Sequence, residues 1–277
     1  MERISEPRVA VIGGVNMDIG GSPFAKLVMR DSNPGVITAR PGGVGRNIAH
    51  DLRLLGMDVS LVAAVGGDVY GQGILESCRE LGIDMSLARI LPERRSSTYL
   101  YVTDETGDMQ IGIADMEITE CITPEYLESR MEEINRFDAV VLDANLSAES
   151  VEYAARHCAA PIIADPVSTA KAARLVPVLD RLWAIKPNIY EAEKLTGEHD
   201  PEKAAAALLD KGVKRVFISL GEEGMLAAER GGSVHMPREL VTVVNTTGAG
   251  DAATSAIVWA ALAGLDIAGC ARAAVKA

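Results

Sequence analysis

The chain has 277 residues, of which 48% are hydrophobic and only 4% aromatic, and this is ample for one large aliphatic core. Its 27 basic and 39 acidic residues give a net charge of −12, which excludes a general nucleic-acid surface because binding a phosphate backbone needs a basic face. The cysteines are isolated, the N-terminus carries no signal-peptide pattern, and no apolar run is long enough to span a bilayer. We therefore expect a cytoplasmic protein with no membrane or nucleic-acid partner.

Short β-branched runs alternate with segments of helical spacing along most of the chain. The expected strands are 9–12, 59–65, 139–142, 161–164 and 216–219. The expected helices are 48–55, 74–81, 124–134, 148–157, 192–195 and 204–209. This alternation predicts an α/β fold with a doubly wound, mostly parallel sheet and helices on both faces. Because no internal repeat or low-complexity linker interrupts it, we expect a single domain over residues 1–277.

Two segments break the alternation, at about residues 16–40 and 97–117. The first has no helical period, and the second holds two strand-like runs that flank the turn signal Asp104-Glu105-Thr106-Gly107. We expect the two segments to form a small β-sheet that projects as a lid over the site, with two ordinary surface excursions as the alternative. The exposed edge of such a sheet and its apolar face predict a homodimer through the lid. The expected apolar face contains Tyr99, Tyr101, Ile111 and Ile113.

Two polar motifs follow the start of the fold. Asn16 and Asp18 leave the first strand at its carboxyl end, where open α/β sheets bind ligands, and an amide and a carboxylate can hold neighbouring sugar hydroxyls. An Asx turn is the alternative. Gly42-Gly43-Val44-Gly45-Arg46-Asn47 opens the next helix, and its glycines let a ligand approach the backbone closely. It lacks the G-K-[ST] of a P-loop, and a plain glycine-rich helix start is its alternative.

Two later motifs can contact a nucleotide. In Lys186-Pro187-Asn188-x-x-Glu191, Asn188 is a plausible N-cap and Glu191 stands three positions later, as in a capping box. The functional alternative is a pair that holds Mg²⁺-bound water near a triphosphate. The turn from Ser219 through Gly221 to Gly224 can bind nucleotide phosphates through backbone N–H groups, or can simply join two strands. No His or Cys spacing predicts a zinc site.

Residues 245–253, Asn-Thr-Thr-Gly-Ala-Gly-Asp-Ala-Ala, are the most informative stretch. They follow the apolar run 240–244 and open an Ala-rich helix. A glycine turn there leaves N–H groups free at the positive end of the helix dipole, which suits an anion, and Asp251 beside it can take a proton from an attacking hydroxyl. The run also fits the dinucleotide fingerprint G-x-G-x-x-A, but no strand follows it. A glycine turn that caps a buried helix is the remaining alternative.

Together these motifs resemble the PfkB (ribokinase-like) sugar and nucleoside kinases over essentially the whole chain. Segment 41–49 resembles the first family signature, 245–252 the second, and Asn188-x-x-Glu191 the Mg²⁺ motif. The resemblance implies a ribokinase-like fold and ATP- and Mg²⁺-dependent transfer of the γ-phosphoryl group to a sugar hydroxyl. It implies that Asp251 is the base and that Gly248, Ala249 and Gly250 form the anion hole. The implied sugar contacts are Asn16, Asp18, Gly42, Gly43 and Asn47, and the implied ATP contacts are Asn188, Ser219, Gly221 and Gly224.

A narrower resemblance is visible to the bacterial pseudouridine kinases of this family. It rests on segments 31–35, 41–49, 64–66, 68–72 and 165–168, on Lys171, and on Asn245, where most members carry Asp. It implies phosphorylation of the 5′-hydroxyl of pseudouridine. The alternatives are a ribokinase or another nucleoside kinase of the family, and a ligand-binding regulator that keeps the fold without catalysis.

Pseudouridine differs from uridine by a second ring N–H, so only a hydrogen-bond acceptor can read the difference by direct contact. The candidates are Asp31, Ser32, Asn33, Thr98 and Asp115. The run 31–33 ranks first because it belongs to the narrower resemblance, with a turn before Pro34 as the alternative. Lys171 is a donor that suits a base carbonyl or a phosphate, and Asn145 completes the expected substrate contacts.

Two further features of the family concern the C-terminal part of the chain. Members usually continue through C-terminal elements that complete the adenine side of the ATP site, so with an end at Ala277 we expect these elements to be missing and the adenine contacts to be incomplete. Some members also carry a loop for a monovalent cation such as K⁺. We expect Asn245 to alter that loop.

Overall fold

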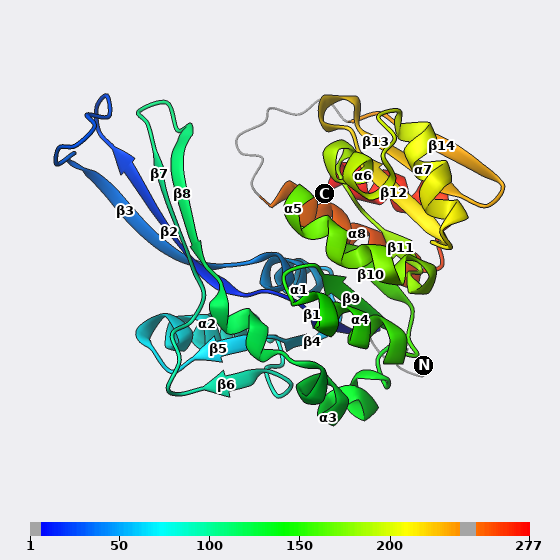
Figure 1. Ribbon diagram of the computed structural model, residues 1–277, viewed down its shortest axis with the longest axis horizontal. Coiled ribbons are helices and arrows are strands. Elements are labelled where there is room, and N and C mark those ends of the chain that lie inside the picture. The colour runs from blue at the N-terminus through cyan, green and yellow to red at the C-terminus, as the bar shows by residue number, and fades with distance from the viewer. Residues whose placement is uncertain (1–6, 239–247) are drawn as a thin grey trace.

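The computed structural model describes residues 7–238 and 248–277. Its main sheet has eight strands, and the expected doubly wound topology is confirmed (Figure 1). In spatial order these are β14 (Gly232–Met236), β13 (Met225–Glu229), β12 (Arg215–Ser219), β11 (Ala184–Ile185), β10 (Ile162–Asp165), β9 (Ala139–Asp143), β1 (Arg8–Ile12) and β4 (Asp58–Val62). The pairs from β12 to β4 are parallel, and β13 and β14 add an antiparallel edge.

Helices cover both faces of this sheet because successive strand residues point to opposite sides. In β1, Ala10 and Ile12 enter one core, and Val9 and Val11 enter the other. The first core is covered by α3 (Pro124–Ile134), α4 (Ala148–His157), α5 (Thr169–Ala172), α6 (Ile189–Thr196) and α7 (Pro201–Asp210). The second core is covered by α1 (Val44–Leu54), α2 (Val69–Glu80), α8 (Ala249–Leu262) and α9 (Ile267–Lys276). Short 3₁₀ helices are η1 (Glu117–Cys121), η2 (Ala173–Arg181) and η3 (Gly221–Glu223).

The helix starts separate into two kinds, and the difference locates the site. Seven of the helices begin at Asp, Thr, Ser or Asn side chains that accept a hydrogen bond from the first turn, namely α2, α3, α4, α5, α6, α7 and α9. By contrast, α1 begins at Gly43 and α8 at Gly248, with φ of 96° and 83° and no side-chain cap. No side chain therefore caps the first-turn N–H groups of these two helices, and in α1 the Arg46 N–H donates to the backbone carbonyl of Gly14.

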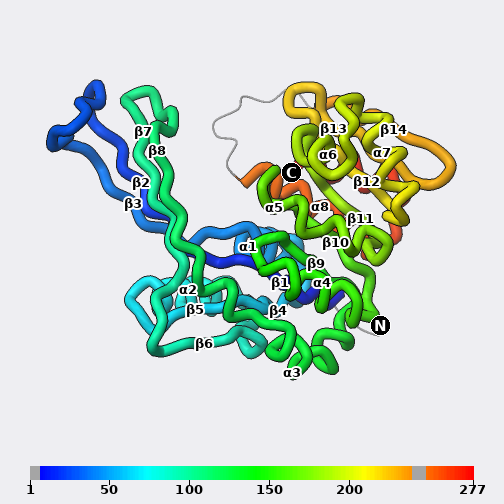
Figure 2. Tube along the Cα trace, in the orientation of Figure 1, coloured from blue at the N-terminus to red at the C-terminus, as the bar shows by residue number. Residues whose placement is uncertain are grey.

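The lid predicted from the two interrupting segments is present as a four-stranded sheet. It contains β3 (Gly35–Gly42), β2 (Asn16–Pro23), β7 (Thr98–Thr103) and β8 (Met109–Asp115), in that spatial order. Figure 2 shows the two hairpins rising together from the body of the fold, with both hairpin tips at the far end. Since β2 follows β1 directly and β3 leads into α1, the lid grows out of the carboxyl edge of the main sheet.

Some details of the sequence prediction were wrong. The expected strand 59–65 is two strands, because the chain leaves the main sheet after Val62 and β5 (Ala64–Gly66) pairs with β6 (Arg89–Leu91) instead. The predicted apolar face does not exist, because the cross-strand register places Tyr99 and Tyr101 on one face of the lid and Ile111 and Ile113 on the other. The expected run 240–244 and Asn245 lie outside the described residues. Among the residues that the model describes, no helix is long and apolar enough to cross a membrane.

Candidate active site

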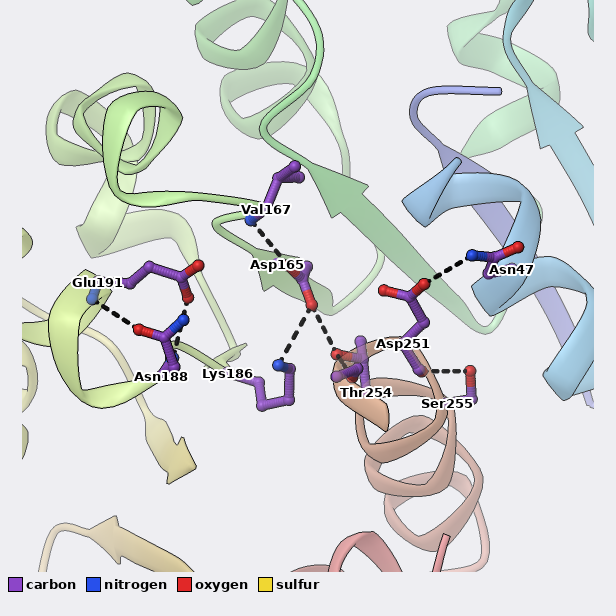
Figure 3. Close-up of polar contacts among 10 residues, drawn as sticks. Asn47, Asp165, Val167, Lys186, Asn188, Glu191, Asp251, Thr254 and Ser255 are labelled. Atoms are coloured by element: carbon purple, nitrogen blue, oxygen red, sulfur yellow. Dashed lines mark hydrogen bonds and ion pairs between the residues drawn. The ribbon is translucent and has the colours of Figure 1, made fainter. Parts of the chain in front are cut away.

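The site lies at the carboxyl edge of the parallel strands, facing the start of α8. Gly13 follows β1, Asp143 and Asp165 end β9 and β10, and Lys186 follows β11. Register places Asp165 beside Asp143. All four strands are buried and run in the same direction, so their ends meet at one place. The first turn of α8 brings Asp251 to the same edge (Figure 3).

Asp251 stands in the first turn of α8 and points toward α1. Its Oδ2 accepts a hydrogen bond of 2.8 Å from the side-chain amide of Asn47. Burial raises the pKa of Asp251 to about 7, helped by the nearby Asp165 carboxylate, while the Asn47 hydrogen bond and Lys186 act in the opposite direction. A carboxyl group with a pKa close to neutrality can take a proton from a hydroxyl and release it again.

Asp165 and Lys186 form a buried ion pair next to α8 that the sequence analysis did not assign. Lys186 Nζ lies 3.5 Å from Asp165 Oδ2, and both side chains are less than a tenth exposed. Asp165 also accepts hydrogen bonds of 2.8 Å from the Thr254 hydroxyl and from the backbone N–H of Val167. A Cβ atom at Gly250 would lie 3.3 Å from Lys186 Nζ, so the ammonium group lies directly against the glycine turn (Figure 3).

Two cavities meet at the first turn of α8. The larger, of about 1050 Å³, is lined by the lid together with Asp18, Asn47 and Gly248. The smaller, of about 580 Å³, is lined by Lys186, Gly250, Asp251 and the start of α6. Ala249 lines both. The start of α8, which has no side-chain cap, therefore stands between two ligand-sized spaces, with the Asp251 carboxyl group and the Lys186 ammonium group on the side of the smaller one.

Of the five residues expected to hold a sugar, Asp18 and Asn47 line the larger cavity, and Asn16, Gly42 and Gly43 lie behind Asp18. Asn16 Nδ2 donates a 2.5 Å hydrogen bond to Asp18 Oδ1. Burial raises the pKa of Asp18, opposed by Asn16 and by the charge of Arg46. A Cβ atom at Gly42 would lie 2.0 Å from Asp18 Oδ2, so only glycine leaves room for that carboxylate. Gly43 needs its positive φ and lies against Asn16.

A series of hydrogen bonds at the end of β9 supports this region. Lys171 Nζ donates to Asn145 Oδ1 at 2.6 Å, and Asn145 Nδ2 donates to Asp143 Oδ2 at 2.9 Å. The same Asp143 oxygen accepts from the backbone N–H of Gly14. Burial raises the pKa of Asp143 and lowers that of Lys171. Asn145 and Lys171 are thus tied to the loop that carries Asn16.

The expected nucleotide contacts line the smaller cavity together. These residues are Asn188, Glu191, Ser219, Gly221 and Gly224. The capping box is complete, because Asn188 Oδ1 accepts from the Glu191 N–H and Glu191 Oε2 accepts from the Asn188 N–H, both at 2.9 Å. Glu191 is buried, and burial raises its pKa. A capping role and a place at the cavity therefore coexist in the same residue.

The residues expected to read a base are not brought to this site. Asp31, Ser32 and Asn33 lie in the β2–β3 connection at the lid tip, where Asn33 exchanges hydrogen bonds with the backbone of Val28 and donates to that of Asp31. Thr98 and Asp115 pair with each other at the lid base. They occupy the face opposite to Asp18, and none of the five lines the larger cavity. Their role in reading the base stays a prediction.

One signal in the sequence could have identified Asp165 and Lys186 as candidate site residues. Asp165 directly ends a buried strand, and Lys186 directly follows another, so both are charged residues at the carboxyl edge. Their contact with Thr254 and Gly250 depends on how α8 docks, and that is set by packing between distant segments.

Comparison with known proteins identifies the family. The model of the pfkB family of carbohydrate kinases matches residues 6–277. A pseudouridine kinase of Escherichia coli is 39% identical over 251 residues, covering 88% of this chain and 80% of the relative. A sugar kinase of the same organism, YeiI, is 33% identical over 272 residues, covering 96% and 75%. A carbohydrate kinase from Agrobacterium tumefaciens superposes with a TM-score of 0.88 at 29% identity, covering 98% and 89%. The chain therefore belongs to the pfkB family of carbohydrate kinases.

Proposed function

We propose that this protein transfers the γ-phosphoryl group of ATP to the 5′-hydroxyl of pseudouridine, giving pseudouridine 5′-phosphate and ADP. The observation that carries the proposal is the first turn of α8, where Ala249 lines both an acceptor-sized and a nucleotide-sized cavity and Asp251 lines the smaller one while it accepts a hydrogen bond from Asn47 of the larger one. The choice of pseudouridine is supported by the 39% identical pseudouridine kinase of E. coli.

Each side of the helix start has a distinct part in the proposed reaction. The ribose is held in the larger cavity by Asn16, Asp18, Gly42, Gly43 and Asn47. Asp251 accepts the proton of the 5′-hydroxyl as its oxygen attacks the γ-phosphorus and the bond to the β-phosphate oxygen breaks.

Negative charge on the transferring group meets preorganised positive partners. They are the backbone N–H groups of Gly248, Ala249 and Gly250, the positive end of the α8 dipole and the Lys186 ammonium group. Because Lys186 is buried, its interaction with charge on the transferring group is stronger than it would be in bulk solvent. The same arrangement holds the reacting groups in line between the two cavities.

Mg²⁺ fits the start of α6, next to the nucleotide cavity. Among residues 7–238 and 248–277, no cluster of three or more His, Cys, Asp or Glu side chains forms a ready metal cage. Mg²⁺ instead keeps several waters and uses one or two carboxylates together with substrate phosphates. Glu191 lines the cavity with one oxygen in the capping box, and its other oxygen is suited to a metal-bound water. When bound, Mg²⁺ supplies charge neutralisation for the phosphates.

Glu191→Gln is expected to raise the Mg²⁺ concentration needed for half-maximal activity with little change in melting temperature. Glutamine at this position can still accept the Asn188 N–H bond, so the capping box survives while the negative charge is lost. Mg²⁺ titrations of activity and thermal unfolding of the same preparations measure both quantities. A lower melting temperature with an unchanged Mg²⁺ curve would show that Glu191 only caps α6.

The lid is expected to form a homodimer through its outer face. Ile37, Ile111 and Ile113 are 79%, 54% and 59% exposed, and cross-strand register places all three on the face opposite to Asp18. Exposed apolar patches of this kind mark interfaces. Light scattering at micromolar concentration should give twice the chain mass, and Ile111→Lys with Ile113→Lys should give the monomer. A monomeric unmodified protein would contradict the prediction.

The proposed reaction is tested by identifying the product. Incubation with ATP, Mg²⁺ and pseudouridine should give a nucleoside monophosphate whose phosphorus couples to the 5′ protons in ³¹P NMR. The 33% identical sugar kinase supports an alternative substrate, a free sugar such as ribose. Transfer to ribose without transfer to pseudouridine would overturn the proposal and leave the family assignment intact.

A further inference from the structure

The inner face of the lid carries two tyrosine rings beside the proposed sugar site. Register places Tyr99 next to Asp18 and Tyr101 next to Gly20 on the neighbouring strand β2. Both tyrosines line the larger cavity, and their ring centroids lie 5.9 Å apart with an interplanar angle of 30°. The inner face thus presents a half-buried aromatic surface that continues directly from the sugar site.

Two glycines allow these rings to lie flat against the sheet. A Cβ atom at Gly20 would lie 2.5 Å from the Tyr101 ring, and one at Gly112 would lie 2.6 Å from the Tyr99 hydroxyl oxygen. Glycine weakens a strand interior and often marks the close approach of another group. Here each glycine receives a tyrosine that leans over the backbone, which leaves the opposite face of each ring toward the cavity.

The spacing of the strands brings this surface within reach of a substituent on the sugar. Neighbouring strands lie about 4.8 Å apart, so a ring attached to a ribose at Asp18 falls over Tyr99 and Tyr101. On the other side of β2, Arg40 pairs with Asp18 and Thr38 pairs with Gly20, and both line the cavity. Their side chains supply hydrogen-bond donors beside the aromatic surface, which suit the carbonyl oxygens of a pyrimidine ring.

We propose that Tyr99 and Tyr101 form the seat for the planar base of the substrate, so that the site selects a ribose carrying a base over a free sugar. The inference rests on the proposed kinase function and on the sugar position at Asp18. The two rings bind the base by stacking, which is tolerant of ring identity, and Arg40 and Thr38 orient its carbonyl groups. The seat therefore provides selection for nucleosides as a class.

Calorimetric titration of pseudouridine into the full chain tests the seat. Tyr99→Ala and Tyr101→Ala should each raise the Kd about 10-fold to 100-fold, the range expected for loss of one stacked aromatic side chain. Tyr99→Phe and Tyr101→Phe retain the ring and should recover most of the affinity. Gly20→Ala should also weaken binding, because the added methyl group displaces the Tyr101 ring. Phe24→Ala removes a lid aromatic that is 73% exposed and should bind pseudouridine as the unmodified protein does.

Several outcomes would contradict the proposal that Tyr99 and Tyr101 bind the base. One is an unchanged Kd in the alanine variants, and another is an equal loss in the phenylalanine variants, which would mean that the hydroxyl groups act and the rings do not. A third is unmodified protein that binds ribose as tightly as nucleosides. The proposed function fails separately, when the unmodified protein binds nucleosides on the seat but transfers no phosphoryl group to them.

Discussion

Asp251→Asn is expected to lower kcat about 10²-fold to 10⁴-fold, the usual contribution of a general base. Asparagine has nearly the same shape and can accept the Asn47 hydrogen bond, so the start of α8 is preserved. It cannot take the proton of the attacking hydroxyl. Turnover is measured by ADP release and pseudouridine binding by calorimetry, and binding should stay close to that of the unmodified protein. Near-normal turnover in this variant would remove Asp251 from its role as the base.

The raised pKa of Asp251 adds a pH signature to the same variant. The base must be ionised to act, so kcat/KM of the unmodified protein should rise with pH up to about pH 7 and then level off. Folding raises this pKa from 3.8, so the folded state holds the proton more tightly and this group makes the fold less stable as the pH rises from 3.8 to about 7. Asp251→Asn should therefore melt at a higher temperature than the unmodified protein at pH 8. A lower melting temperature there would contradict the desolvation of Asp251.

Lys186→Met is expected to lower kcat by about 10²-fold to 10³-fold, the cost of removing one preorganised partner of transition-state charge. It should also destabilise the fold by about 3–5 kcal/mol, because Asp165 is left buried without its cation. Lys186→Arg should not restore activity, since a planar guanidinium group does not replace the compact point charge of the ammonium group. Kinetics and chemical unfolding measure the two losses.

A double variant separates the two roles of Lys186. Removing both charges, in Asp165→Asn with Lys186→Met, should recover most of the stability, because no unpaired charge stays buried. It should not recover turnover. If activity returned together with stability, Lys186 would serve only to neutralise Asp165.

The sequence predicted the elements whose signals are local. The alternating pattern located α3 and α4 with the bounds that the structure has, and the two segments that break the pattern form the lid strands. The glycine motifs located the starts of α1 and α8, because a helix start depends on a few consecutive residues. The capping box of Asn188 and Glu191 and the turn from Ser219 to Gly224 were also located, since caps and turns are local as well.

The rest depended on contacts between distant segments. Tyr99 and Ile111 were expected to share a face, but the side on which each points is fixed by the register between β7 and β8. Residues Val59–Val65 were predicted as one strand, because periodicity does not show which sheet a strand joins. The ion pair of Asp165 with Lys186 needs three segments to meet at α8, and no spacing in the sequence encodes that meeting.

A comparison of kcat/KM for pseudouridine, uridine and ribose, in an ADP-release assay with ATP and Mg²⁺, decides whether this protein is a pseudouridine kinase. We expect the highest value for pseudouridine, a value at least about tenfold lower for uridine, which lacks the second ring N–H, and the lowest value for ribose. A value for ribose that equals or exceeds that for pseudouridine would contradict the proposed function.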